Sequence, residues 1–201
     1  MFTGIIRAFG TVARVQRAQG VIRVSILAPT IASQVAPLDS VAVNGVCVSA
    51  VSVNRQMIAF EVIPETQRLT TLGRLRQGQQ VNVEPSLSVA DRVGGQILFG
   101  HVDGVGTIVK RQLRDGEVIL TVRLARELRR LLVPKGPIAV DGVSLTVGRT
   151  LGATSFSVHL IPETRRGTVL DARMVGNRVN LEVDYLAKLV WQFVGARRRA
   201  Y

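Results

Sequence analysis

SVAVNGVCV at residues 40–48 returns as PIAVDGVSL at residues 137–145, and this repetition decides the fold. Other segments repeat in the same order. IPET stands at residues 63–66 and 161–164, and GQQVNVE at 78–84 answers GNRVNLE at 176–182. The separation is 96 residues near the start, where GTV at 10–12 matches GTI at 106–108, then 97 and finally 98. A nearly constant separation indicates a duplicated domain, because a solenoid would need shorter and more numerous repeats.

Each repeat consists mainly of short alternating segments with Gly, Asn or Asp between them. This pattern predicts antiparallel strands in a barrel or sandwich, so the chain belongs to the all-β class. We also expect a short helix after each IPET box, capped by Thr66 or Thr164, and another through residues 125–132. The domain boundary is expected near residues 91–96 (DRVGGQ). The expected strands are Val21–Leu27, Ile58–Ile63, Val81–Glu84, Val118–Leu124, Phe156–Ile161 and Val179–Val183.

Composition narrows the class of protein. The 201 residues include one cysteine and two histidines, so the sequence predicts neither an intrachain disulfide nor a metal site. The beginning of the chain lacks the pattern of a secretory signal, and no apolar run is long enough to cross a bilayer, so we expect a cytoplasmic protein. The net charge of +12 fits either a solvated, arginine-rich face or a nucleic-acid-binding surface. Base stacking would need exposed aromatic residues among the basic ones, and the few aromatics are scattered.

The last segment, residues 186–201, lies outside both repeats. Leu186, Leu189, Val190, Phe193 and Val194 fall at helical spacing on one face, which predicts an amphipathic helix. An apolar face of this kind serves either as an oligomer contact or as packing against the helix's own barrel.

Five ordered motifs resemble the riboflavin synthase family: MFTGI at residues 1–5, SVAVNGVCV, the IPET boxes, GHVDG at 100–104 and AVDGVSLTV at 139–147. The resemblance implies two six-stranded antiparallel Greek-key barrels, at residues 1–96 and 97–185, and a C-terminal trimerisation helix at 186–201. It also implies that the first barrel of one chain pairs with the second barrel of its neighbour. The chain departs from the family at Val48-Ser49, where Leu-Thr is usual, at Gln96, where His is usual, and at Phe99, where Ser is usual.

The reaction that this resemblance implies converts two molecules of 6,7-dimethyl-8-ribityllumazine into riboflavin and 5-amino-6-(D-ribitylamino)uracil, without a cofactor. The implied partners are this substrate, two further copies of the chain and lumazine synthase. Neither nucleic acid nor membrane is implied. The substrate carries its own reactivity, in an acidic 7-methyl group and an electrophilic C7. The protein therefore has to pair two flat rings and manage protons.

By resemblance, the catalytic residues are Ser40, Cys47, His101 and Asp184. The first site is expected to use Gly4, Ile5, Ile6, Cys47, Val48, Ser49, Glu61, Val62, Ile63, Pro64, Glu65, Thr66, Gly100, His101 and Val102. The second site is expected to use Lys135, Ser144, Leu145, Thr146, His159, Leu160, Ile161, Pro162, Glu163 and Thr164.

The two repeats carry different side chains at several of the expected site positions, as a reaction with unequal roles for two identical substrates would require. Ser40 aligns with Pro137, Cys47 with Ser144, and His101 with Ile5. This places the titratable groups in the first site, which favours proton transfer or nucleophilic addition there. The structural alternatives are a buried apolar cysteine, a turn histidine and, for Asp184, a helix cap. A non-catalytic lumazine- or flavin-binding antenna protein with the same two barrels is the main competing function.

Overall fold

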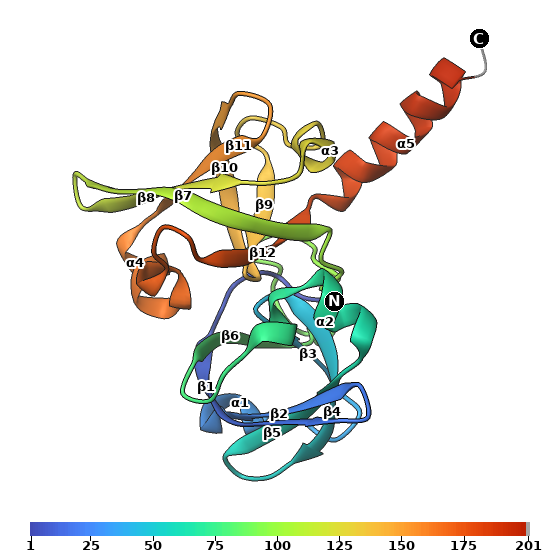
Figure 1. The fold of residues 1–201 in the computed structure, drawn as a ribbon, viewed down its shortest axis with the longest axis vertical. Coiled ribbons are helices and arrows are strands. Elements are labelled where there is room, and N and C mark those ends of the chain that lie inside the picture. Colours follow the sequence, from blue (N-terminus) through green and yellow to red (C-terminus); the bar gives the residue numbers. More distant parts are fainter. Residues whose placement is uncertain (200–201) are drawn as a thin grey trace.

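A computed structural model describes residues 1–199, without the side chains of 195–199, and contains two closed β-barrels, one above the other in Figure 1. The first barrel has the strand order β1-β2-β5-β4-β3-β6, with every pairing antiparallel. Its strands are β1 (Ala8–Ala18), β2 (Val21–Leu27), β3 (Ser40–Val43), β4 (Val46–Val53), β5 (Met57–Val62) and β6 (Gln80–Pro85).

The second barrel repeats this topology, with the strand order β10-β11-β8-β7-β12-β9 and antiparallel pairing throughout. The predicted all-β class and the six strands in each barrel are confirmed. Its strands are β7 (Gly104–Arg114), β8 (Glu117–Arg123), β9 (Pro137–Val140), β10 (Val143–Leu151), β11 (Ser155–Leu160) and β12 (Arg178–Val183).

Alternating side chains fill each barrel. In β2, Ile22, Val24 and Ile26 point into the first core, and in β11, Phe156, Val158 and Leu160 fill the second. Full burial of one such side chain stabilises the fold by roughly 1.5–3 kcal/mol, so two separate cores stabilise two separate barrels. The outward residues of the same strands remain available for ligands.

The short helices differ from the expected capping. Helices α2 (Pro64–Leu69) and α4 (Pro162–Gly167) begin at the prolines of the IPET boxes, because proline suits the first helical position and has no N–H to satisfy. Thr66 and Thr164 therefore lie inside the helices, and the prediction that they cap them was wrong. Thr70 and Thr168 instead cap the following 3₁₀ turns, η1 (Thr71–Arg74) and η2 (Val169–Ala172).

Two other helices flank the barrels. The helix α1 (Pro29–Ala32) packs Ile31 and Ala32 into the first core. The helix expected over residues 125–132 is a single turn, α3 (Arg126–Arg129).

The barrels meet across an approximate two-fold axis that relates equivalent residues. The side-chain amide of Asn82 donates to the carbonyl oxygen of Asp141 at 2.9 Å, and that of Asn180 donates to Asn44 O at 2.8 Å. Both side-chain oxygens accept backbone N–H groups from the opposite barrel, of Val169 for Asn82 and of Thr71 for Asn180. The two buried amides thereby hold the barrels in one relative orientation.

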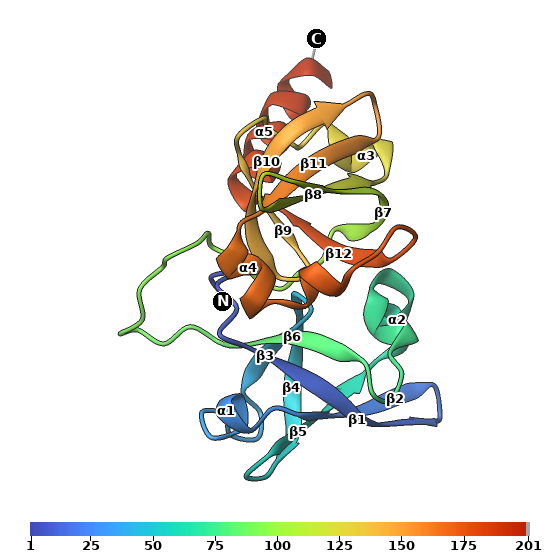
Figure 2. The same ribbon diagram turned by 90° about the vertical axis from the view of Figure 1, so that its left-hand side faces the viewer.

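The last helix, α5 (Tyr185–Arg199), leaves the second barrel and projects away from both (Figures 1 and 2). Two contacts tie its first half to the barrel. Lys188 forms an ion pair with Asp103 at 2.7 Å, and the Arg130 guanidinium lies 5.0 Å from the ring centre of Trp191. No helix among residues 1–199 is long and apolar enough to span a membrane.

A glycine pair at the barrel interface gives a test of this packing. Gly45 has φ +76°, and an added Cβ would lie 2.5 Å from the backbone nitrogen of Gly142. Gly78 has φ +84°, but an added Cβ would meet nothing within 4 Å. Both alanine variants carry the same left-handed strain, of about 1–2 kcal/mol. We expect Gly45→Ala to lower the free energy of unfolding by roughly 1–3 kcal/mol more than Gly78→Ala, measured by chemical denaturation. Equal losses of unfolding free energy in the two variants would show that the barrel interface accommodates the added methyl group without a further penalty.

Candidate functional site

The segment that precedes each barrel packs on the other barrel. Phe2 and Leu98 form an antiparallel bridge, with Phe2 N donating to Leu98 O at 2.8 Å and Leu98 N donating to Phe2 O at 3.0 Å. Because the two segments run in opposite directions, they leave this bridge toward opposite ends. The N-terminal segment packs on the second barrel before it continues into the first, and the segment around Leu98 packs on the first barrel before it continues into the second. This crossing creates two equivalent clusters.

The first cluster forms around Cys47. Its backbone N–H donates to Gly100 O at 3.0 Å, and Val102 packs against the first core. Gly100 has φ +72°, and an added Cβ would lie 2.6 Å from the Cβ of Cys47, so only glycine allows this approach. Ser40 and Ser49 are paired across β3 and β4 beside it. The structure thus brings together the predicted residues from three separate segments.

The second cluster forms around Ser144 and corrects the expected grouping. Ser144 N donates to Gly4 O at 2.9 Å, and Ile6 packs against the second core. We expected Gly4, Ile5 and Ile6 to belong to the first site, but this segment lies on the second barrel. The cause is the crossing of the two leading segments, which sequence order alone does not reveal. Exposed Thr146 lies farther along β10.

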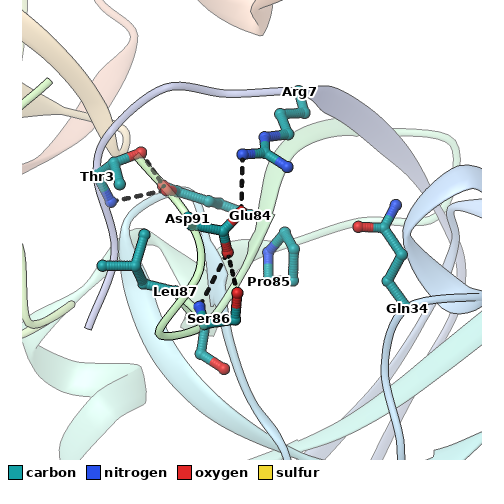
Figure 3. Close-up of a pocket in the computed structure, with 9 residues that line it drawn as sticks. Thr3, Arg7, Gln34, Glu84, Pro85, Ser86, Leu87 and Asp91 are labelled. Carbon is teal, nitrogen blue, oxygen red and sulfur yellow. Dashed lines mark hydrogen bonds and ion pairs between the residues drawn. The ribbon is translucent and has the colours of Figure 1, made fainter. Parts of the chain in front are cut away.

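Two buried glutamates hold these segments in place. Glu84 accepts hydrogen bonds from Thr3 N at 2.7 Å, Thr3 Oγ1 at 2.8 Å and Gly4 N at 3.1 Å. It lines a cavity of about 250 Å³ beside Arg7 (Figure 3). Glu182 accepts from Phe99 N at 2.8 Å and Gly100 N at 3.0 Å. Sequence reasoning missed both residues, although each ends a repeated box, GQQVNVE or GNRVNLE.

Burial raises the pKa of both glutamates. The cause is desolvation of the charged carboxylate, which the backbone hydrogen bonds from the two crossing segments only partly offset. The segments therefore rest on carboxyl groups that bind a proton more tightly in the folded protein than in the unfolded chain.

The IPET boxes lie at the rim of each barrel. Ile63 and Ile161 are exposed, while Val62 and Leu160 point into the cores. Val62 and Leu160 can therefore contact a ligand only through their backbone, and the same holds for buried Val48 and Leu145 in the neighbouring strands.

Equivalent hollows lie on the outer faces of the two barrels. One of about 500 Å³ is lined by Glu61, and one of about 430 Å³ by His159. Glu61 forms an ion pair with Arg23 at 3.5 Å, whereas His159 Nδ1 lies 3.0 Å from Glu117. The two barrels thus present different charges at matching positions.

The remaining predicted residues make other contacts. His101 is exposed and stacks on Phe99, with 6.0 Å between ring centres. The carboxylate of Asp184 accepts Leu186 N at 3.2 Å, as expected of a helix cap. Lys135 is exposed, and its backbone N–H donates to Val147 O. No group of three potential metal ligands occurs within residues 1–199.

Comparisons with known proteins agree with this duplicated architecture. The family model "Lumazine binding domain" matches residues 3–86 and again 99–184. Riboflavin synthase of Mycobacterium tuberculosis is 42% identical over 195 residues, which cover 94% of this chain and 96% of that protein. Riboflavin synthase of Bacillus subtilis is 34% identical, with 96% and 90% covered. A solved structure of LumP complexed with riboflavin has a TM-score of 0.84 at 22% identity, covering 91% of this chain and 99% of that one, which shows the shared fold.

The matched model and the two barrels define a protein of two tandem lumazine-binding domains. Identity over nearly the full length of both relatives narrows this class further. The chain belongs to the riboflavin synthase family.

The two glutamates predict a specific dependence of stability on pH. A carboxyl whose folded pKa is raised stabilises the fold below its unfolded pKa, about 4.3, and this contribution is lost as pH rises through the folded pKa. The double variant Glu84→Gln, Glu182→Gln lacks this titration. We expect its melting temperature to be lower than that of the wild type at pH 4, and the difference to shrink toward pH 8. A difference that widens with pH would show that both carboxylates are stabilised as anions.

Proposed function

We propose that the chain converts two molecules of 6,7-dimethyl-8-ribityllumazine into riboflavin and 5-amino-6-(D-ribitylamino)uracil, as a transferase of riboflavin biosynthesis. The observation that carries this proposal is the match of both halves to a lumazine-binding domain. Two identical substrates suit two similar barrels, each with an outward cluster of small polar residues. The names of the curated relatives point to the same activity.

The reaction moves a four-carbon unit from one lumazine to the other, so the protein has to hold two rings face to face. Proximity of this kind lowers the activation barrier by several kcal/mol. In the first site we assign the addition at C7, direct or through a positioned water, to Cys47 or Ser40, and the proton transfer to His101. In the second site, the hydroxyls of Ser144 and Thr146 bind the edge of the pteridine without titrating near neutral pH.

Pairing the two rings requires a second copy of the chain. Within one chain the Cys47 and Ser144 clusters lie at opposite ends of the bridge between Phe2 and Leu98. The first site of one chain therefore faces the second site of a neighbour in our proposal. The apolar face of α5 supports this arrangement, because Leu186, Val190 and Phe193 on it are 68%, 63% and 68% exposed. We infer a homotrimer joined by α5.

An antenna protein is the second candidate, because solved LumP structures, one complexed with 6,7-dimethyl-8-(1'-D-ribityl) lumazine, share the fold. Such a protein would need to bind a chromophore but not to move protons. Phe99, stacked beside His101, is the observation that favours it. Location in the cytoplasm and association with lumazine synthase stay predictions.

Turnover distinguishes these functions and the roles of the two sites. The wild-type chain should form riboflavin from the lumazine, followed by its absorbance, whereas an antenna protein would bind the lumazine unchanged. We expect His101→Gln to lower kcat about 10²–10⁴-fold with a smaller effect on binding. Thr146→Val should act mainly on KM, by about 1–3 kcal/mol. The opposite pattern in two folded, trimeric variants would reverse the assigned roles.

Removal of residues 186–201 tests the trimer. The barrels should remain folded, because none of residues 186–194, the part of this segment whose side chains the structure describes, belongs to either core. We expect monomers with little or no turnover, measured by light scattering and riboflavin formation. A truncated chain that stays trimeric would contradict the role of α5.

A further inference from the structure

Gln96 contacts both the crossing N-terminal segment and the second cluster. Its backbone N–H donates to Thr3 O at 3.0 Å, and its side-chain Oε1 accepts the hydroxyl of Ser144 at 2.9 Å. In the first cluster Cys47 stands at the position that matches Ser144, so the hydroxyl that donates this hydrogen bond is absent there. The contact therefore distinguishes the second site from the first, where Cys47 replaces Ser144.

This hydrogen bond determines what Ser144 can recognise. A serine hydroxyl has one proton to donate and two lone pairs that accept. The hydroxyl proton of half-buried Ser144 points to Gln96 Oε1, so the remaining lone pairs of Ser144 Oγ can only accept. A partner for this oxygen must therefore supply an N–H or O–H group.

The other end of the Gln96 side chain argues against a purely structural role. Its Nε2 is buried and has no hydrogen-bond partner within residues 1–199. A buried donor without a partner destabilises a fold, and an apolar side chain of similar length would avoid this penalty. The hydrogen bond that Gln96 Oε1 accepts from Ser144 is therefore what a glutamine provides at this position and an apolar side chain would not.

We propose that Gln96 is a positioning residue that fixes Ser144 Oγ as the acceptor for the ring N–H of the pyrimidinedione in the second site. The inference rests on the proposed function, which supplies the ligand. The pteridinedione ring of the lumazine carries one N–H, between two carbonyl groups, and this group matches a fixed acceptor. Gln96 thereby orients the ring without contacting the reacting carbons.

The test uses Gln96→Met, Gln96→His, Ser144→Ala and the double variant Gln96→Met, Ser144→Ala in the full chain. Methionine removes the acceptor and the unpartnered amide, whereas a neutral histidine keeps an acceptor nitrogen. We expect Gln96→Met to raise KM for 6,7-dimethyl-8-ribityllumazine about tenfold, with kcat nearly unchanged and a melting temperature no lower than that of the wild type. Gln96→His should restore most of the lost affinity.

The double variant separates positioning from independent effects. If Gln96 acts through Ser144, the double variant should have nearly the KM of Ser144→Ala alone. Any of three results would overturn the inference. They are KM effects of the two substitutions that multiply in the double variant, an unchanged KM in Gln96→Met, and a lower melting temperature of Gln96→Met that Gln96→His does not restore. A wild-type chain that forms no riboflavin would instead overturn the proposed function on which the inference rests. Riboflavin formation together with any of those three results would overturn the inference alone.

Discussion

The structure depends on the exchange of two short segments between the barrels. Each segment brings a glycine against the strand β4 or β10 of the opposite barrel, so that Cys47 N donates to Gly100 O and Ser144 N to Gly4 O. The backbone approach is too close for any Cβ, and a buried glutamate fixes each segment from behind. Neither cluster can form in an isolated barrel without its crossing segment. The composition of both sites follows from this constraint, which fixes the orientation of the barrels together with the contacts of Asn82 and Asn180.

The pseudo-symmetry is broken at a few positions. At the barrel interface, Asn44 is matched by Asp141, whose carboxylate pairs with Arg173 at 2.7 Å, where the first repeat has Leu75. In the clusters, Cys47 is matched by Ser144. A symmetric frame with unequal side chains suits a reaction in which one of two identical molecules donates carbons and the other accepts them.

Local patterns in the sequence predicted the duplication and six of the twelve strands that the structure describes, whereas β1, β3, β4, β7, β9 and β10 were not among the expected segments. Alternation in residues 21–27 or 156–161 reflects the two faces of one strand, and no distant contact is needed to detect it. The predicted helix caps were wrong because the proline of each IPET box begins its helix, which leaves Thr66 and Thr164 inside it. The threonines that do act as caps, Thr70 and Thr168, belong to the 3₁₀ turns that follow.

The site was predicted less completely, because its geometry depends on long-range contacts. The segments around Cys47 and Gly100 were grouped correctly, but Gly4 was assigned to the wrong barrel. Glu84 was overlooked because an acidic residue at the end of a strand usually faces solvent. Its burial becomes apparent only when the N-terminal segment folds over it.

The central claim is that each reaction site combines the first barrel of one chain with the second barrel of another. Coexpression of a His101→Gln chain with a Thr146→Val chain tests it, with turnover measured at a subsaturating lumazine concentration at which each variant alone is impaired. In mixed trimers, the intact first barrel of the Thr146→Val chain meets the intact second barrel of the His101→Gln chain. The account predicts that riboflavin formation by purified mixed trimers exceeds that of either variant alone. Mixed trimers no more active than the better parent would contradict a site shared between chains.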